Sequence, residues 1–172
     1  MQVLRKVGIA LLTLAILVVL WRALLVGVAL LVLLILALVA WQQFDVWNAG
    51  QRFRRAYRSV GKDLLLVYSN SPHWQSYVEA NWIPRWTTRA VTLNWSERTT
   101  WRRSQPEVAL FHALAGDREY NPLAIVVPPH GRPIVVRFWK AFRDYKHGKD
   151  QKLIQQEAEL ERLLALYPPP TT

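Results

Sequence analysis

The segment Ser69–Trp74, with the sequence SNSPHW, carries the side chains best suited to chemistry in this chain. It follows the apolar run Leu64–Tyr68, and a helical pattern begins directly after it. Backbone N–H groups at a helix N-terminus stabilise negative charge, so a nucleophile at such a junction gains reactivity. Chemistry here would use a hydroxyl, an amide or an imidazole, and the candidate residues are Asn70, Ser71, Pro72 and His73.

The composition narrows this chemistry. The chain has no cysteine, which excludes disulfides, thiolate catalysis and cysteine-ligated metal centres. The histidines are His73, His112, His130 and His147. They show neither the i, i+4 spacing nor the HExxH pattern of metal sites, and the sequence has no glycine-rich phosphate loop. We therefore predict no catalytic residue, no metal and no cofactor.

The elements that position this turn follow from hydrophobic periodicity and from proline and glycine positions. Strands are predicted at 64–68, 89–95, 122–127 and 133–139, and helices at 73–82, 106–116 and after Asp150, the expected cap of the last helix. The first helix is expected to end before Pro84. The short connection between the last two strands predicts an antiparallel pair. The order βαβαββα therefore predicts an α/β fold with parallel neighbours and an antiparallel edge.

The residues from about Lys62 to Leu166 resemble the thioredoxin-like fold in element order and in two proline positions. In this resemblance Asn70–His73 takes the place of the Cys-x-x-Cys turn, and Pro122 corresponds to the proline that the family holds in cis before its third strand. Because both thiols are absent, the resemblance implies a redox-inactive domain. Glutathione-transferase-like relatives use Ser or Tyr at this turn, so activation of a bound thiol by Ser71 or Tyr68 is the alternative.

An apolar segment runs from Val7 to Trp41 and contains one charged residue, Arg22. As an α-helix it would measure about 52 Å, against about 30 Å for the hydrocarbon core of a bilayer. A hairpin of two transmembrane helices that turns near Trp21–Gly27 accommodates this length. The alternative is one span near Leu24–Trp41 that follows an interfacial or partly inserted helix.

Basic residues flank the apolar segment on both sides. Arg5 and Lys6 precede it, and four arginines follow it between residues 52 and 58. Cytoplasmic flanks carry an excess of Lys and Arg, so two basic flanks favour an even number of crossings and hence the hairpin. We therefore predict an integral membrane protein whose soluble domain lies on the cytoplasmic side.

The second flank is an aromatic and arginine-rich segment over residues 45–62. Residues 1–62 hold eight Lys and Arg against one Asp, so +7 of the net charge of +10 lies beside the apolar segment. Aromatic rings suit the headgroup layer and arginines suit lipid phosphates, so we predict an interfacial helix, with Phe53 among its headgroup aromatics. A solvated linker helix is the alternative. The predicted membrane-surface contacts are Trp47, Arg52, Arg54, Arg55 and Arg58.

A second cluster of tryptophan and arginine, NWSERTTWRRS, follows the strand predicted at 89–95. Trp and Arg are enriched at the hot spots of protein interfaces, so we predict a partner interface. Core packing of several tryptophans is the alternative, and nucleic acid is not expected as a partner. The predicted interface residues are Trp95, Arg98, Trp101, Arg102 and Arg103.

These features divide the chain into four segments. Residues 1–44 are the predicted anchor, 45–62 the interfacial helix, 63–167 the thioredoxin-like domain and 168–172 a tail. The predicted function is that of a non-catalytic accessory or assembly subunit of a membrane protein complex, photosynthetic or respiratory. Its partners would be the other subunits and anionic lipid headgroups. A membrane-anchored enzyme or small-ligand binder that uses the Ser71–His73 turn is the competing hypothesis.

Overall fold

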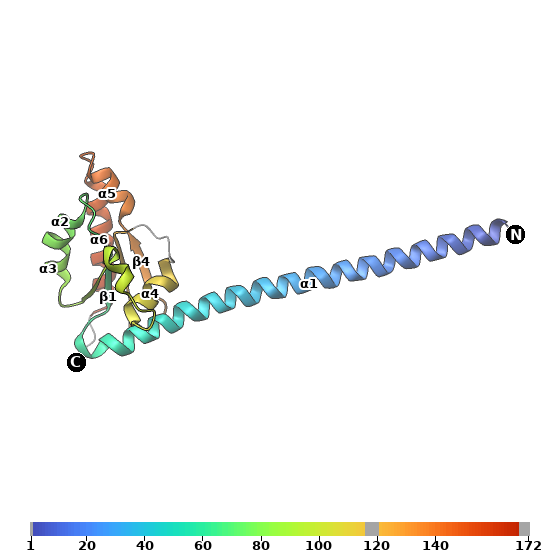
Figure 1. Cartoon of the computed structure of the whole chain (residues 1–172), viewed down its shortest axis with the longest axis horizontal. Coiled ribbons are helices and arrows are strands. Elements are labelled where there is room, and N and C mark those ends of the chain that lie inside the picture. Colours follow the sequence, from blue (N-terminus) through green and yellow to red (C-terminus); the bar gives the residue numbers. More distant parts are fainter. Residues whose placement is uncertain (1, 116–120, 169–172) are drawn as a thin grey trace. The chain divides into compact units, whose positions relative to one another are not determined.

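The computed structural model describes residues 2–115 and 121–168, and between residues 3 and 18 it describes only some of the side chains. The chain divides into two compact units, residues 1–43 and 44–172. The first unit is the larger part of α1, a continuous helix over Gln2–Tyr57 (Figure 1). The second unit holds the last turns of α1, a four-stranded sheet and the helices around it.

The hairpin turn predicted near Trp21–Gly27 is absent, because these residues are helical and continuous with their neighbours. The segment Val3–Trp41 contains no proline, and helix-forming apolar residues surround its two glycines, Gly8 and Gly27. One glycine costs a helix only about 1 kcal/mol relative to alanine, which does not interrupt such a sequence. From Val19 onward α1 is long and apolar enough to cross a membrane, which agrees with the alternative of one span.

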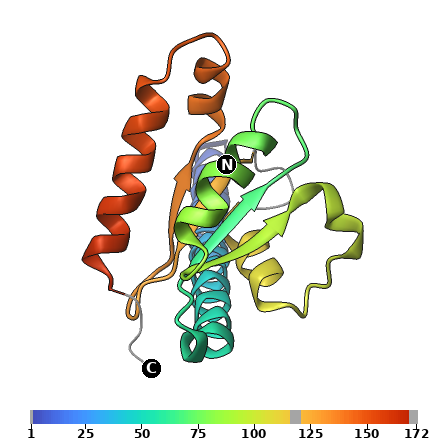
Figure 2. The ribbon, with the colours of Figure 1, turned by 90° about the vertical axis from the view of Figure 1, so that its left-hand side faces the viewer.

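The second unit is built on a mixed four-stranded sheet in the order β2-β1-β3-β4 (Figure 2). The strands are β1 (Leu64–Tyr68), β2 (Ala90–Asn94), β3 (Leu123–Val126) and β4 (Ile134–Arg137). β1 pairs in parallel with β2 and antiparallel with β3, and β3 pairs antiparallel with β4. The four predicted strands and the antiparallel pairing of the last two are confirmed, with ends that differ by at most two residues.

The helices of this unit are α2 (Gln75–Tyr77), α3 (Ile83–Trp86), α4 (Pro106–Ala115), α5 (Trp139–Tyr145) and α6 (Gln151–Leu166). A π-helical turn, η2 (Val78–Trp82), joins α2 to α3, and two 3-10 helices, η1 (Arg58–Val60) and η3 (Trp95–Thr100), follow α1 and β2. The helical segment predicted to end before Pro84 therefore continues to Trp86. The π turn immediately before Pro84 widens the backbone, where the Ile83 N–H donates to the Val78 carbonyl, and this accommodates the proline ring.

Two details of the C-terminal half also differ from the prediction. β4 ends at Arg137, and α5 begins where the strand was expected to continue. Phe138, Ala141 and Phe142 are all buried, and their i, i+3, i+4 spacing is that of a helix packed on one face. α6 begins after Asp150 as predicted, but the Asp150 side chain makes no capping hydrogen bond.

The central strands are buried on both faces because helices cover each side of the sheet. Leu64 and Leu66 of β1 belong to one core cluster, together with residues of α5, α6 and the segment from η2 to α3. Leu65 and Val67 belong to a second cluster on the other face, together with residues of α4 and of the end of α1. The alternation along one strand thus separates two hydrophobic cores.

The end of α1 is a core element of the second unit. Ala49 and Phe53, one helical turn apart, are buried in the cluster that includes β1, β3 and α4, and Phe53 is 0% exposed. The prediction that the Phe53 ring lies among lipid headgroups is therefore corrected. Gly50 permits a close approach here, since a Cβ atom at this position would lie 3.0 Å from Cγ of Pro133 in the loop between β3 and β4.

Two of the tryptophans fill the other core. Trp82 and Trp86 are 1% and 4% exposed, as the core-packing alternative expected for part of the set. Their indole N–H groups donate to carboxylates of α6, from Trp82 to Glu157 at 2.7 Å and from Trp86 to Glu161 at 3.3 Å. The Tyr77 hydroxyl also donates to Glu157, at 2.9 Å. A buried indole needs an acceptor, and α6 supplies one for each ring.

Candidate functional site

Several of the predicted site residues lie at one end of the sheet, where strands begin or finish. β3 runs in the direction opposite to β1, β2 and β4. This end of the sheet therefore holds the carboxyl ends of those three strands and the amino end of β3. The turn Asn70–His73, η3 and Pro122 therefore meet there. The loop from β3 to β4 and the connection from α1 to β1 lie at the opposite end of the sheet. The sequence predicted the turn and the tryptophan and arginine cluster as separate features, and the parallel pairing of β1 with β2 brings them together.

The polar groups of the Asn70–His73 turn are engaged within the domain. The Asn70 amide N–H donates to the Ser96 hydroxyl at 3.0 Å, and the Asn94 side chain donates to the Asn70 side-chain oxygen at 2.6 Å. The Ser71 hydroxyl accepts a long bond from the His73 backbone N–H, at 3.4 Å. Nucleophilic catalysis by Ser71 would require a base bonded to its hydroxyl, and the described residues place no imidazole or carboxylate in that position.

Pro122 lies beside this turn at the start of β3, and the Asn121–Pro122 peptide bond is cis, as the resemblance implied. The proline is buried, and its carbonyl accepts from the Phe138 N–H at 3.0 Å, which joins β3 to the start of α5. Asn121 is 8% exposed. Within residues 2–115 and 121–168, no donor reaches its side-chain oxygen.

The predicted partner interface is partly an extension of the core. The rings of Trp95 and Trp101 both pack on Phe111 of α4, with centroid distances of 5.5 and 5.6 Å, and each tryptophan is half-buried. The Arg98 guanidinium stacks over Trp95 at 5.2 Å from the ring centroid. Arg102 and Arg103 are exposed. The tryptophans thus fix η3 on α4, and the arginines provide most of the surface.

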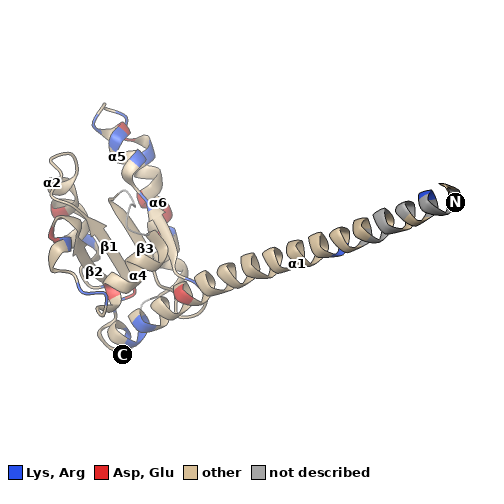
Figure 3. Ribbon diagram, turned by 45° about the vertical axis from the view of Figure 1, so that its right-hand side comes forward, with Lys and Arg blue, Asp and Glu red and all other residues tan. Residues whose placement is uncertain are grey.

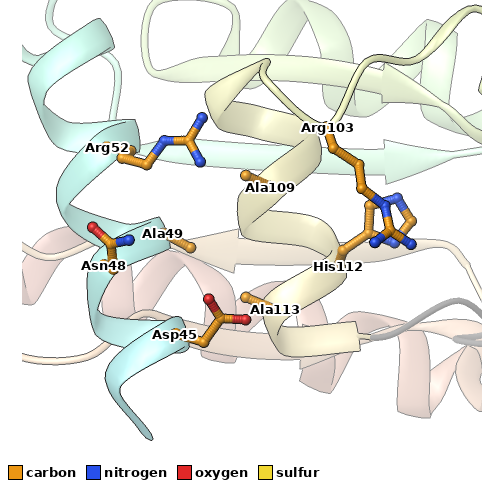
Figure 4. Close-up of a pocket in the computed structure, with 8 residues that line it drawn as sticks. All are labelled: Asp45, Asn48, Ala49, Arg52, Arg103, Ala109, His112 and Ala113. Atoms are coloured by element: carbon orange, nitrogen blue, oxygen red, sulfur yellow. The ribbon is translucent and has the colours of Figure 1, made fainter. Parts of the chain in front are cut away.

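A groove between the end of α1 and α4 adjoins this surface (Figure 4). It encloses about 300 Å³ and is lined by Asp45, Asn48, Ala49, Arg52, Arg103, Ala109, His112 and Ala113. Alanines line its floor, because side chains this short leave space between two packed helices. Figure 4 shows the Asp45 carboxylate pointing towards Ala113. Arg103 and His112 also line the groove. The groove therefore combines an apolar floor with charged groups of both signs at its rim.

Sequence reasoning found only Arg52 and Arg103 of this groove, and neither as a groove residue. Ala109 and Ala113 are one helical turn apart in α4, which is a usable signal of a small-residue face. Ala49 lines the same groove because of the way α1 packs on the sheet, which the sequence does not indicate. Asp45 follows Trp41 by about 6 Å of helix, so the groove lies close to the point where the chain leaves the apolar segment.

The five predicted membrane-surface residues do not share one environment. Arg52 donates to the Ser104 carbonyl at 2.8 Å and lines the groove. Arg54 donates to the Pro128 and Gly131 carbonyls, each at 3.0 Å. Trp47, Arg55 and Arg58 are exposed, and Trp47 has 46% of its surface accessible. At about 100° per residue, Trp47, Arg54 and Arg55 fall within an arc of about 100° on one side of α1, and Arg52 lies on the other side of Phe53.

Burial raises the pKa of Tyr57 and of Tyr68, as it does that of Tyr77 in the other core. The pKa of Tyr57 rises because the ring is partly buried and because its hydroxyl bonds to Glu107 at 2.6 Å. The pKa of Tyr68, the alternative thiol-activating residue, rises through burial and through the charges of Glu79 and Glu97. Both phenols therefore stay protonated near neutral pH and act as uncharged hydrogen-bonding groups.

A buried ion pair lies at the opposite end of the sheet, just before β1 and β2. Asp63, just before β1, accepts from the Arg89 guanidinium at 2.9 Å, and Arg89 also donates to the Leu164 carbonyl at the end of α6. Asp63 is 6% exposed, so we interpret this ion pair as a contribution to the stability of the fold. In the described part of the chain, no group of three or more His, Asp or Glu side chains is arranged to hold a metal ion.

Comparison of the chain with models of protein families, with curated proteins and with solved structures gives no match.

Proposed function

We propose that the chain is a membrane-anchored, non-catalytic subunit that docks a partner protein of a membrane complex through the groove between α1 and α4. The observation that carries the proposal is the position of Arg103. It belongs to the predicted partner surface, and it lines a groove that begins within about 6 Å of helix from the apolar segment. An apolar floor with a charged rim is the usual composition of a docking site.

The length of the apolar segment supports a complex over an isolated anchor. A helix over Val7–Trp41, about 52 Å long, would fit a hydrocarbon core of about 30 Å only at a tilt of about 55°, beyond the usual range of about 0–40°. One crossing that starts after Arg22 leaves the preceding apolar turns outside the span. We infer that helices of partner subunits cover these turns, because an all-apolar helix requires an apolar environment.

The thioredoxin-like assignment belongs to the same proposal. The strand order, the cis bond at Pro122 and the helix after the Asn70–His73 turn support it. The absence of cysteine makes such a domain redox-inactive. The arginines that follow the apolar segment outnumber the cations before it, so for a single span we propose that the domain is cytoplasmic. Single-cysteine variants at Gln2 and Thr172 should then label from opposite sides, and labelling from the same side would contradict a single span.

Purification from native membranes in a mild detergent tests the docking proposal. The wild-type chain should migrate in an assembly larger than itself, and Arg103→Glu should release it because the rim charge is reversed. Ser71→Ala is the matched control, since this residue lies outside the groove, and it should leave the assembly and its function unchanged. A wild-type chain that runs as a monomer without partners would refute the proposal. Loss of function by Ser71→Ala or His73→Ala in an intact assembly would instead favour chemistry at the turn.

A further inference from the structure

The end of α1 and the loop from β3 to β4 border a second hollow, which is open to solvent and which we name the arginine hollow. It has a volume of about 600 Å³, and its lining residues are Gln51, Arg54, Arg55, Arg58, Ser59, Pro129 and His130. Three of the described residues that line it are arginines, and none of these lining residues carries a carboxylate. Figure 3 shows basic residues of α1 gathered towards its C-terminal end. The hollow is separate from the groove, with which it shares no lining residue.

Arg54 provides a fixed positive charge at this hollow. Its guanidinium donates to the Pro128 and Gly131 carbonyls, each at 3.0 Å, so the side chain is held against the loop. Its Nε atom is buried and has no acceptor among the described residues. Burial lowers the pKa of Arg54 below its usual value, because desolvation disfavours the charged guanidinium. A negative charge in the hollow would relieve this cost.

Arg55 and Arg58 supply exposed donors beside this fixed charge. Both side chains are exposed, and within the described ranges neither forms an ion pair with Asp or Glu. They are three residues apart and therefore neighbours on one side of the chain. A guanidinium matches the geometry of a phosphate group, to which it can donate two parallel hydrogen bonds. Two such groups and the fixed charge of Arg54 can together surround one phosphate.

The position of these arginines at a helix end explains only part of this arrangement. A cation in the last turn of a helix interacts favourably with the helix dipole, by about 0.3–1 kcal/mol. This accounts for the presence of basic residues, but it requires neither a hollow nor a carbonyl clamp on Arg54. It also leaves the charges of Arg55 and Arg58 without an Asp or Glu partner among the residues that the structure describes.

We propose that the arginine hollow is a binding site for a phosphate group, with Arg55 and Arg58 as its donors and Arg54 as the fixed charge behind them. The inference builds on the predicted contact of Arg54, Arg55 and Arg58 with anionic headgroups. It goes further by locating the contact in one hollow and by naming the phosphate group as the ligand. A lipid phosphate and a free phosphate share this chemistry.

The test uses the full chain in a neutral detergent and two probes. Phosphatidic acid, compared with phosphatidylcholine, is followed by the retention of one lipid in native mass spectrometry. Inorganic phosphate is followed by its phosphorus NMR linewidth. The variant is Arg55→Gln/Arg58→Gln, and the matched control is Lys140→Gln/Lys146→Gln, which removes the same charge from exposed positions in and after α5. Equal melting temperatures verify that both variants are folded.

The arginine variant should bind roughly twenty-fivefold more weakly than wild type, from about fivefold for each arginine, and the lysine control should bind like wild type. If the arginine variant weakens the binding of phosphatidic acid alone, the ligand is a lipid. If it weakens the binding of inorganic phosphate alone, the ligand is soluble. Equal weakening by the two double variants would overturn the proposal, because the effect would then be one of net charge. No binding of either probe by wild type would also overturn it.

The outcome is independent of the docking proposal. If wild type purifies as a monomer but binds phosphate through the arginines, the site stands and the docking function fails. If wild type assembles with partners but binds neither probe, the docking function stands and the site fails.

Discussion

Replacement of Phe53 by alanine tests whether the end of α1 belongs to the soluble domain. The ring is 0% exposed, packs on Tyr57 at a centroid distance of 4.8 Å, and lies in the cluster that contains Leu65 of β1. Transfer of a buried phenylalanine side chain to water costs about 1.5–3 kcal/mol. The cavity left against a sheet and two helices cannot collapse fully, which brings the expected total to about 3–5 kcal/mol. That is a large part of a typical domain's stability of about 5–15 kcal/mol.

The assay is denaturant unfolding of the full chain in detergent, followed by the fluorescence of the tryptophans in the sheet domain. The matched control is Phe44→Ala in the same helix, because Phe44 is 58% exposed. Its unfolding free energy should change by no more than about 0.5 kcal/mol, as for ordinary surface positions. An effect of Phe53→Ala below 1 kcal/mol, or equal to that of Phe44→Ala, would refute the packing of α1 on the sheet. Residues 44–57 would then be a linker helix.

Two further predictions concern buried polar groups. Asp63→Ala leaves the Arg89 guanidinium buried without its carboxylate, and should lower the unfolding free energy by about 3 kcal/mol. The control Lys152→Gln breaks an exposed pair and should lower it by about 1 kcal/mol or less. Equal losses of the two variants in denaturant unfolding would contradict a buried pair. Burial and the hydrogen bond to Glu157 raise the pKa of Tyr77. Because the folded state holds this proton more tightly than the unfolded state, stability is fully present below about pH 10 and is lost as the pH rises further, by about 1.4 kcal/mol per unit. Tyr77→Phe should reduce this slope in urea unfolding at alkaline pH, and an unchanged slope would show that another group is responsible.

The local elements of the sheet domain were predictable because their signals are local. The uninterrupted apolar run at Leu64–Tyr68 marks a strand buried on both faces, and Pro106 marks the start of α4. The short Pro–Gly connection before Ile134 predicts the antiparallel pair that the structure contains. The helix across Pro84 was not predictable in this way, because the π turn that accommodates the proline is stabilised by the packing of Val78 and Trp82 in the core.

The candidate sites depended more strongly on long-range contacts. Sequence composition alone indicated where aromatic and basic residues concentrate, and it predicted a helix over the segment that contains Phe53 and Arg54. The same composition suits a helix on a lipid surface and a helix packed on a sheet, because both have one apolar and one basic side. Only the tertiary structure decided between them for Phe53, by placing β1 and α4 against its ring. The groove beside Ala49 and the hollow beside Arg54 exist for the same reason, since each is formed by segments that are distant in the sequence.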